Sequence, residues 1–118
     1  MTLRRIAFTV VAVAGLAVLP AASAVGGTPL TKTVSVGDDY YGPTTVTVKK
    51  NTTVKWKWLP DNYDSHDVKL SKGPKGAPKF QSGSAASDYT FARKLTKVGS
   101  YKIICTLHQE MLMTIKVK

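Results

Sequence analysis

The chain has few of the residues that staple small domains covalently or build large metal centres. Its 118 residues include one cysteine, two histidines and seven acidic residues, against 17 Lys and Arg. One cysteine cannot form an internal disulfide, so a domain of this size must be held together by its core. The length fits a single domain.

The start of the chain has the pattern of a secretory signal. The pair Arg4-Arg5 precedes an apolar run from Ile6 to Leu19, and Ala22-Ser23-Ala24 supplies the small residues of a cleavage site. The apolar run is too short to cross a bilayer comfortably. We therefore predict a signal peptide over residues 1–24 and a mature domain over residues 25–118. An uncleaved membrane anchor is the alternative.

The remainder of the chain predicts a location outside the cytoplasm. No later stretch is apolar enough to span a membrane, and no cysteine follows the small residues to carry a lipid. The mature product is expected to be a soluble monomer of the periplasm or cell envelope, without stable membrane insertion. In an oxidising compartment the unpaired thiol of Cys105 needs either burial or a ligand.

Basic residues dominate the charge of the chain. The formal charge of +10 falls to +8 when Arg4 and Arg5 are removed. The lysines are scattered, with no basic helix and no aromatic RNA-binding signature, so a nucleic-acid partner is not expected. Acidic redox partners, or anionic envelope polymers and lipids, fit the sign, since net charge mainly steers association.

Apolar and polar residues alternate through much of the mature chain, which is the period of a β-strand. The clearest strands are Thr45–Lys49 and Thr53–Trp58, and Lys50-Asn51-Thr52 forms a turn between them. One apolar face and one lysine-bearing face describe a half-solvated antiparallel sheet. An earlier strand contains Val34 and Val36.

Other segments carry weaker signals that complete the fold prediction. Tyr40 to Pro43 reads as irregular chain, a short strand resumes within Ser65–Leu70, and Ser71–Ala86 reads as a loop because it is rich in Gly and Pro. Phe80 is expected to dock this loop on the core. About seven short strands and no convincing helix predict an all-β Greek-key β-sandwich. The later strands are marked by Tyr89 and Phe91, by Tyr101, Ile103 and Cys105, and by Met111, Met113, Ile115 and Val117.

Three candidate metal ligands stand close together near the C-terminus. Cys105, His108 and Met111 form the pattern C-x-x-H-x-x-M between two predicted strands. A trigonal site of two histidines and one cysteine with a weak axial methionine is the blue-copper arrangement. His66, the other histidine, lies where a turn-rich segment returns to strand, so it would reach the same end of the sandwich. Each residue alone is common in a protein core, but one copper site would use every histidine and cysteine of the chain.

These patterns resemble the cupredoxins, and among them the small plastocyanin and amicyanin group. The resemblance rests on V-x-V-x-x-N-x-x-V-x-W from Val46 to Trp56, on His66-Asp67-Val68, and on G-x-Y-x-x-x-C-x-x-H-x-x-M from Gly99 to Met111. It implies a cupredoxin-like sandwich that holds one type 1 copper ion. Carried over by residue, the implied ligands are His66, Cys105 and His108 in the equatorial plane and Met111 in the axial position.

Met113 competes with Met111 for the axial position. The spacing from His108 to Met111 resembles the short amicyanin loop, whereas the spacing to Met113 resembles the plastocyanin loop. In both relatives the axial methionine is followed four and six residues later by inward apolar residues. Met111 is favoured because Ile115 and Val117 stand at those positions, whereas the chain ends too early after Met113.

Asp67 departs from the family pattern, which commonly has asparagine after the first histidine. That asparagine bonds to the residue following the cysteine, which here is Thr106. A bond from Asp67 to the Thr106 hydroxyl would tie the two ligand segments together in the same way. An ionised carboxylate near copper would also favour Cu(II). A role in capping a turn is the alternative.

The implied function is single-electron transfer between redox partner proteins by Cu(I)/Cu(II) cycling. The resemblance implies that His108 presents its ring edge to solvent as the point of electron exchange, with Leu107 and Leu112 framing an apolar docking patch. Lysines farther away would steer an acidic partner or serve only solubility. These lysines are Lys72, Lys75 and Lys79.

An enzyme is not expected. Copper oxidases and reductases need a second, substrate-binding copper with further histidines, and none remain after His66 and His108. A Cys/His hydrolase is not expected either, because the chain has no third residue at a recognisable position to orient the base. The alternative function is copper buffering or delivery in the envelope, although the Met-rich and His-rich tracts typical of copper handling are absent.

Overall fold

Alternating buried and exposed side chains build the strands of this protein. The structure is a computed structural model that describes Gly15 and residues 30–118, so the predicted signal segment lies outside the described residues except for Gly15. Within the described part of the chain there are eight strands and no helix, and hence no helix that is long and apolar enough to span a membrane.

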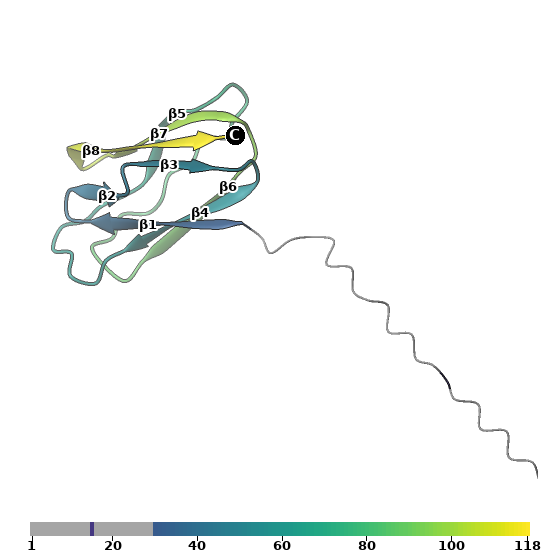
Figure 1. Cartoon of the computed structure of the whole chain (residues 1–118). Helices are drawn as coiled ribbons and strands as arrows, with labels where there is room; N and C mark the ends of the chain where they lie inside the picture. The colour runs from purple at the N-terminus through teal and green to yellow at the C-terminus, as the bar shows by residue number, and fades with distance from the viewer. Residues whose placement is uncertain (1–14, 16–29) are drawn as a thin grey trace, which may run out of the picture.

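Two four-stranded sheets pack face to face (Figure 1). One sheet has the order β2-β1-β4-β6 and the other the order β3-β8-β7-β5. The all-β sandwich predicted from the sequence is confirmed. The strands are β1 (Thr31–Gly37), β2 (Tyr40–Gly42), β3 (Thr45–Val48), β4 (Thr52–Trp58), β5 (Lys69–Lys72), β6 (Thr90–Leu95), β7 (Gly99–Cys105) and β8 (His108–Val117).

The strand directions differ from the sequence-based prediction. β1 pairs with β4 in parallel and β3 pairs with β8 in parallel, so the expected antiparallel sheet is wrong for these pairs. The chain between β3 and β4 does turn at Asn51, whose φ is 70°, but the two strands enter opposite sheets. The alternation of apolar and polar residues indicates which face of a strand is buried, but it does not indicate which strand pairs with it or in which direction. The segment Tyr40–Gly42, expected to be irregular, pairs with β1.

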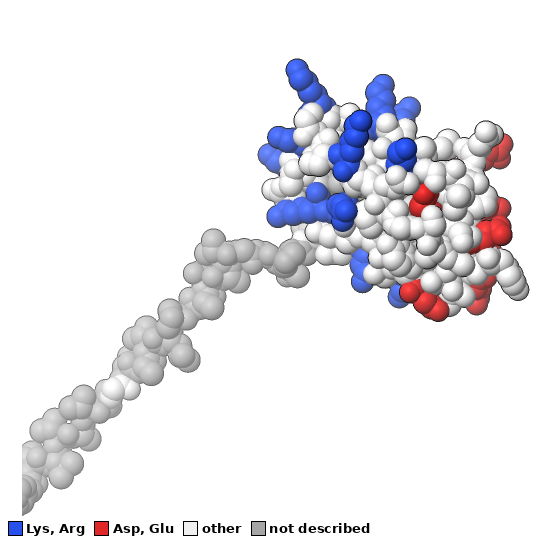
Figure 2. Space-filling view, turned by 180° about the vertical axis from the view of Figure 1, so that it is seen from behind, with Lys and Arg blue, Asp and Glu red and all other residues white. Residues whose placement is uncertain are grey.

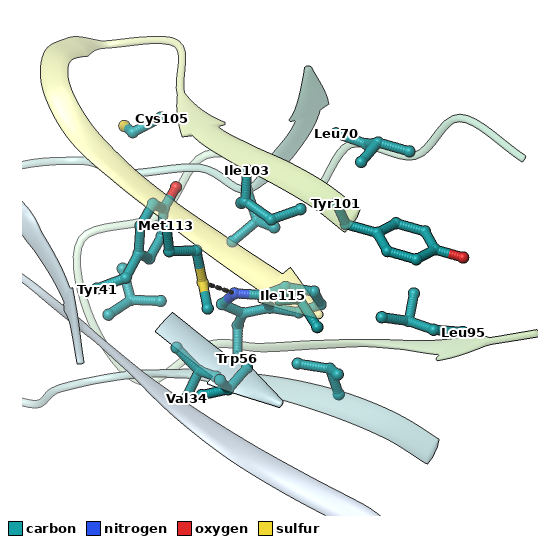
Figure 3. Packing of buried hydrophobic residues seen from close by; sticks show 14 of the residues in the cluster. Val34, Tyr41, Trp56, Leu70, Leu95, Tyr101, Ile103, Cys105, Met113 and Ile115 are labelled. Atoms are coloured by element: carbon teal, nitrogen blue, oxygen red, sulfur yellow. Dashed lines mark hydrogen bonds between the residues drawn. The ribbon is translucent and has the colours of Figure 1, made fainter. Parts of the chain in front are cut away.

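The core lies between the sheets and is built from inward-facing residues of all eight strands. Trp56 is fully buried, and its ring lies 6.0 Å from that of Phe80, which confirms that Phe80 docks the long loop on the core. Figure 3 shows Tyr101, Ile103 and Ile115 packed in the same cluster. Burying such side chains contributes about 1.5–3 kcal/mol each, which lets the sandwich fold without a disulfide.

One end of the sandwich gathers three connections that are distant in sequence. The β1–β2 turn, the segment between β4 and β5, and the short link from β7 to β8 all lie there, because β1, β4 and β7 run toward this end. The candidate ligands His66, Cys105 and His108 belong to two of these connections. The fold therefore brings them together.

Candidate metal centre

His66, Cys105 and His108 form one compact cluster. A ring nitrogen of each histidine and the Cys105 Sγ all lie within 4.8 Å of one another. Cys105 Sγ and His108 Nδ1 are 3.6 Å apart, and the two imidazole centroids are separated by 4.8 Å. Cys105 ends β7 and His108 begins β8, where the ladder is irregular and pairs these two residues directly.

The three side chains of the cluster differ in their exposure to solvent. His66 is fully buried and Cys105 is 3% exposed, whereas the side chain of His108 is 27% exposed. Water is thus kept from the thiol while one histidine edge reaches the surface. The unpaired thiol of Cys105 was expected to need either burial or a ligand, and in the structure it is buried and lies next to two nitrogen donors.

One ring nitrogen of His66 has a hydrogen-bond partner and the other has none among the described residues. Its Nε2 lies 2.9 Å from Asp38 Oδ1, while its Nδ1 is buried with no hydrogen-bond partner among the described residues. A buried, unpaired polar atom is costly and calls for an explanation. A metal ion bound by Nδ1 supplies one, so the residues present fit copper.

Asp38 itself is fixed by the chain that precedes His66. The backbone N–H groups of Tyr63 and Asp64 donate to its carboxylate at 3.0 and 3.2 Å. The hydrogen bond from His66, followed by that from Tyr63, holds the pKa of Asp38 below its usual value. The carboxylate is therefore ionised near neutral pH and can only accept.

The backbone of His66 is anchored to the long loop after β5 and to β4. Its N–H and C=O exchange hydrogen bonds with Ala85, and the indole Nε1 of Trp58 donates to the same carbonyl at 3.1 Å. The long loop after β5 therefore closes over the histidine. The position of His66 is set by backbone contacts as well as by its ring.

Asp67 ties the two ligand segments together. Its Oδ1 accepts the Thr106 backbone N–H at 2.7 Å, and its Oδ2 accepts the Thr106 hydroxyl. The bond predicted from the sequence is thus present, and the backbone bond adds a second. Burial alone would raise the pKa of Asp67, but the bonds from Thr106 and Gln81 outweigh it and lower the pKa.

The two candidate axial methionines differ in what surrounds their sulfur atoms. Met113 Sδ lies 3.3 Å from the Trp56 indole Nε1, which donates to it in the core (Figure 3). Met113 stands opposite Ile103 in the β7–β8 ladder. Met111 is two residues closer to the His108 end, is 1% exposed, and lines the surface depression beside His108.

The exposed edge of His108 faces carboxylates. Its Nε2 lies 3.2 Å from Asp39 Oδ1 and 4.0 Å from Asp64 Oδ2. An open depression beside the ring is lined by Asp39, Leu107, Gln109, Glu110 and Met111. Leu107 and Leu112, expected to frame an apolar patch, are 51% and 53% exposed.

Two residues of the site have roles that sequence reasoning missed. Asp38 was not singled out, and Gln81 was placed only within a loop, yet both touch groups beside the ligands. The only available signal for Asp38 was a carboxylate in a turn at the end of a strand. Nothing in the sequence indicates that this turn and His66, 28 residues apart, meet in space.

Comparisons with known proteins agree with this geometry. Residues 30–118 match the family of copper binding proteins of the plastocyanin/azurin type, and the chain belongs to this family. No curated protein sequence matches the chain. The cofactor of the chain is copper, and the cluster of His66, Cys105 and His108 is the candidate type 1 site.

Solved structures share the fold at low sequence identity. Amicyanin from Paracoccus versutus is 26% identical, with a TM-score of 0.63 over 80% of this chain and 85% of that chain. A reduced Cu(I) form of an amicyanin variant is 21% identical, with a TM-score of 0.64 over 80% and 86% of the two chains. A Cu-containing nitrite reductase from Thermus scotoductus is 23% identical, with a TM-score of 0.62, but only 22% of that chain is covered. The cupredoxin fold is thus established.

Proposed function

We propose that this protein is an exported carrier of single electrons with one copper ion held by His66, Cys105, His108 and Met111. When bound, copper supplies reversible one-electron cycling between Cu(I) and Cu(II). The observation that carries the proposal is the unpartnered, buried Nδ1 of His66, which lies in the same cluster as a buried thiol and a second imidazole.

The surroundings of the ligands favour a rigid centre. Asp38 holds the His66 ring, and Asp67 joins the ligand segments through Thr106. Partners of this kind orient ligands and tune the metal. Since the ligand positions are set by the protein, little has to move when the charge of the site changes, which suits rapid electron exchange.

Each ligand has a separate task in this proposal. Cys105, buried as the last residue of β7, contributes the soft thiolate away from water. His66 contributes its open Nδ1 from the interior. His108 contributes one ring nitrogen to the cluster and brings its partly exposed edge to the surface, where a partner would exchange electrons.

Met111 is the proposed axial ligand. The sulfur of Met113 is already engaged by the Trp56 indole in the core, which supports its reading as a core residue. Met111 shares the inward face of β8 with Met113 but lies nearer to His108, at the end where the cluster forms.

The proposal extends to the setting of the protein. Residues 1–24 would be removed as a signal peptide, and residues 25–118 would act as a monomer in the periplasm or cell envelope. Exchange of electrons with other redox proteins would be its only activity, without catalysis by the chain itself. Copper buffering or delivery is the alternative, since it would use the same residues.

Retention of copper through redox cycles distinguishes a carrier from a delivery protein. We would load the purified protein with copper, reduce it with ascorbate, and follow reoxidation by ferricyanide in a stopped-flow instrument. In parallel, a Cu(I) chelator in excess would report the rate of metal loss. A carrier should be reoxidised many times before copper leaves. Metal loss that outpaces reoxidation would favour delivery, and Cys105→Ser serves as the control without the thiolate.

A further inference from the structure

All seven acidic residues of the chain lie at the end of the sandwich that holds the metal centre. Figure 2 shows Asp and Glu gathered at one end of the domain and most Lys and Arg at the other. We call this region, with the loops that carry these residues, the acidic end. Asp38 and Asp39 follow β1; Asp61, Asp64 and Asp67 lie between β4 and β5; Asp88 precedes β6; and Glu110 lies at the start of β8.

Several of these carboxylates surround the exposed edge of His108. Asp39 and Asp64 lie 3.2 and 4.0 Å from its Nε2. Glu110 and Asp39 line the open depression beside the ring. Electrons that pass through His108 would therefore cross a negatively charged surface.

The basic residues that give the chain its net charge lie mostly elsewhere. Lys50 and Lys118 meet at the opposite end, where their backbones are hydrogen-bonded. The nearest strand lysines, Lys57 and Lys69, are exposed on the outer faces of the two sheets. The part of the long loop that carries Lys75 lies far from the metal centre, because the neighbouring Pro74 packs against Gly99 at the start of β7.

The distance between the two ends of the sandwich and screening by salt weaken the effect of the far lysines on the metal centre. The seven residues of β7 span about 20 Å from Gly99 to Cys105. This is about two Debye lengths at 0.1 M ionic strength, so the far lysines are largely screened at His108. Asp39, Asp64 and Glu110 therefore contribute more to the local field at His108 than the lysines at the far end of the sandwich do.

Apolar side chains lie within this acidic surface. Leu107 lines the depression beside His108, and Tyr63 is 92% exposed next to Asp38, to which its N–H donates. An apolar centre within a polar rim is the usual anatomy of a protein interface. The surface therefore suits a protein partner better than a small ion.

We propose that the acidic end docks a redox protein whose binding face carries Lys and Arg around its own redox group. This inference rests on the proposed electron-carrier function and adds the charge of the partner. It replaces the acidic partner expected from net charge, since steering depends on the field at the docking site. Lys72, Lys75 and Lys79 then serve solubility.

The sign of the salt dependence tests the proposal with small probes. Reduced, copper-loaded protein would be oxidised by tris(phenanthroline)cobalt(III), a trivalent cation, and separately by ferricyanide, a trivalent anion. We expect the rate with the cation to fall as ionic strength rises, and the rate with the anion to rise. The reverse signs would mean that the net positive charge governs approach, and they would overturn the proposal.

Two variants with the same change in net charge separate local from global effects. Glu110→Gln and Val98→Lys each add one positive charge, but Val98 is exposed in the β6–β7 turn at the opposite end. At 0.1 M ionic strength we expect Glu110→Gln to slow oxidation by the cation about 2- to 5-fold and Val98→Lys to leave it unchanged. Equal effects of the two variants would contradict a docking field at the acidic end.

Protein probes complete the experiment. A lysine-rich c-type cytochrome should exchange electrons faster at low than at high ionic strength, and Glu110→Gln should weaken this dependence. An acidic cytochrome b5 should show the opposite dependence; a preference for it would overturn the proposal. Electron exchange with none of the probes would instead overturn the electron-carrier function on which the inference rests.

Discussion

The carboxylate of Asp38 lies 2.9 Å from Nε2 of His66, and Nδ1 of the same ring has no partner among the described residues. Because Asp38 is ionised, it can only accept, so Nε2 must carry the proton. A neutral imidazole with its proton on Nε2 presents the lone pair of Nδ1 to the interior. The β1–β2 turn thus selects the tautomer in which His66 can bind a metal ion.

Loss of the Asp38 carboxylate is expected to weaken copper binding. In Asp38→Ala the His66 ring loses its orienting bond, and we expect the affinity for Cu(II) to fall about 10- to 100-fold, as for other outer-shell partners. Competition titration with a chelator measures this. Asp61→Ala is the matched control, because Asp61 is exposed on the segment between β4 and β5 that carries His66. Equal affinities of the two variants would refute the role of Asp38.

The link between Asp67 and Thr106 is expected to stabilise the fold before any metal binds. Asp67→Ala leaves the Thr106 N–H without its acceptor, which should cost about 1–3 kcal/mol in the free energy of unfolding. Asp67→Asn keeps an acceptor at this position, so it should cost less and should raise the reduction potential of the copper form by removing a negative charge. Urea unfolding of the apoprotein and a redox titration measure the two effects. If Asp67→Asn were as unstable as Asp67→Ala, the hydrogen-bond acceptor alone would not account for the contribution of Asp67 to stability.

The two methionines are expected to respond differently to substitution. Met111→Leu should shift the visible spectrum and raise the reduction potential, since the weak axial donor is lost. Met113→Leu should leave both nearly unchanged but destabilise the fold by about 1–2 kcal/mol, because the buried Trp56 N–H loses its acceptor. Spectroscopy and unfolding on the same samples decide the matter. A spectral shift confined to Met113→Leu would reverse the assignment.

Sequence patterns predicted the class of fold and singled out His66, Cys105 and His108, which the structure brings into one cluster. Alternation of Val and Trp with Lys marks a half-buried strand wherever it pairs, and C-x-x-H-x-x-M places donors on one short loop. The parallel pairing of β1 with β4 and the meeting of Asp38 with His66 depend on the path of the whole chain. Such contacts between distant segments leave no mark in local residue order.

The distribution of charge over the folded domain could not be predicted from the sequence either. The sequence presents an excess of positive charge, and its lysines are spread along the chain. Only the fold reveals that Asp39, Asp64 and Glu110 meet around one histidine. Net charge is a sum over residues, whereas docking depends on where each residue lies.

Burial of Tyr41 predicts a loss of stability in alkaline solution. Its hydroxyl donates to the Asp67 carbonyl at 2.5 Å, and burial, with the nearby Cys105 and Asp67, raises its pKa well above the usual value. The folded state therefore retains a proton that the unfolded chain loses above about pH 10, so the stability should fall as pH rises beyond that point.

Tyr41→Phe tests this origin. The variant should be about 1 kcal/mol less stable at neutral pH, and its stability should fall less steeply above pH ~10. Tyr101, whose pKa burial also raises, would account for part of the remaining decline. Urea unfolding of the apoprotein between neutral and alkaline pH measures the slopes, with the exposed Tyr40→Phe as control. A parallel decline in wild type and Tyr41→Phe would contradict the prediction.

Titration of the purified protein with Cu(II), followed by visible absorption and electron paramagnetic resonance, tests the central claim most directly. Coordination by His66, Cys105 and His108 predicts an intense blue band that saturates at one copper per chain, with the narrow hyperfine splitting of a type 1 centre, and loss of both in Cys105→Ser. A colourless complex with an ordinary tetragonal Cu(II) signal, or a spectrum unchanged in Cys105→Ser, would contradict it.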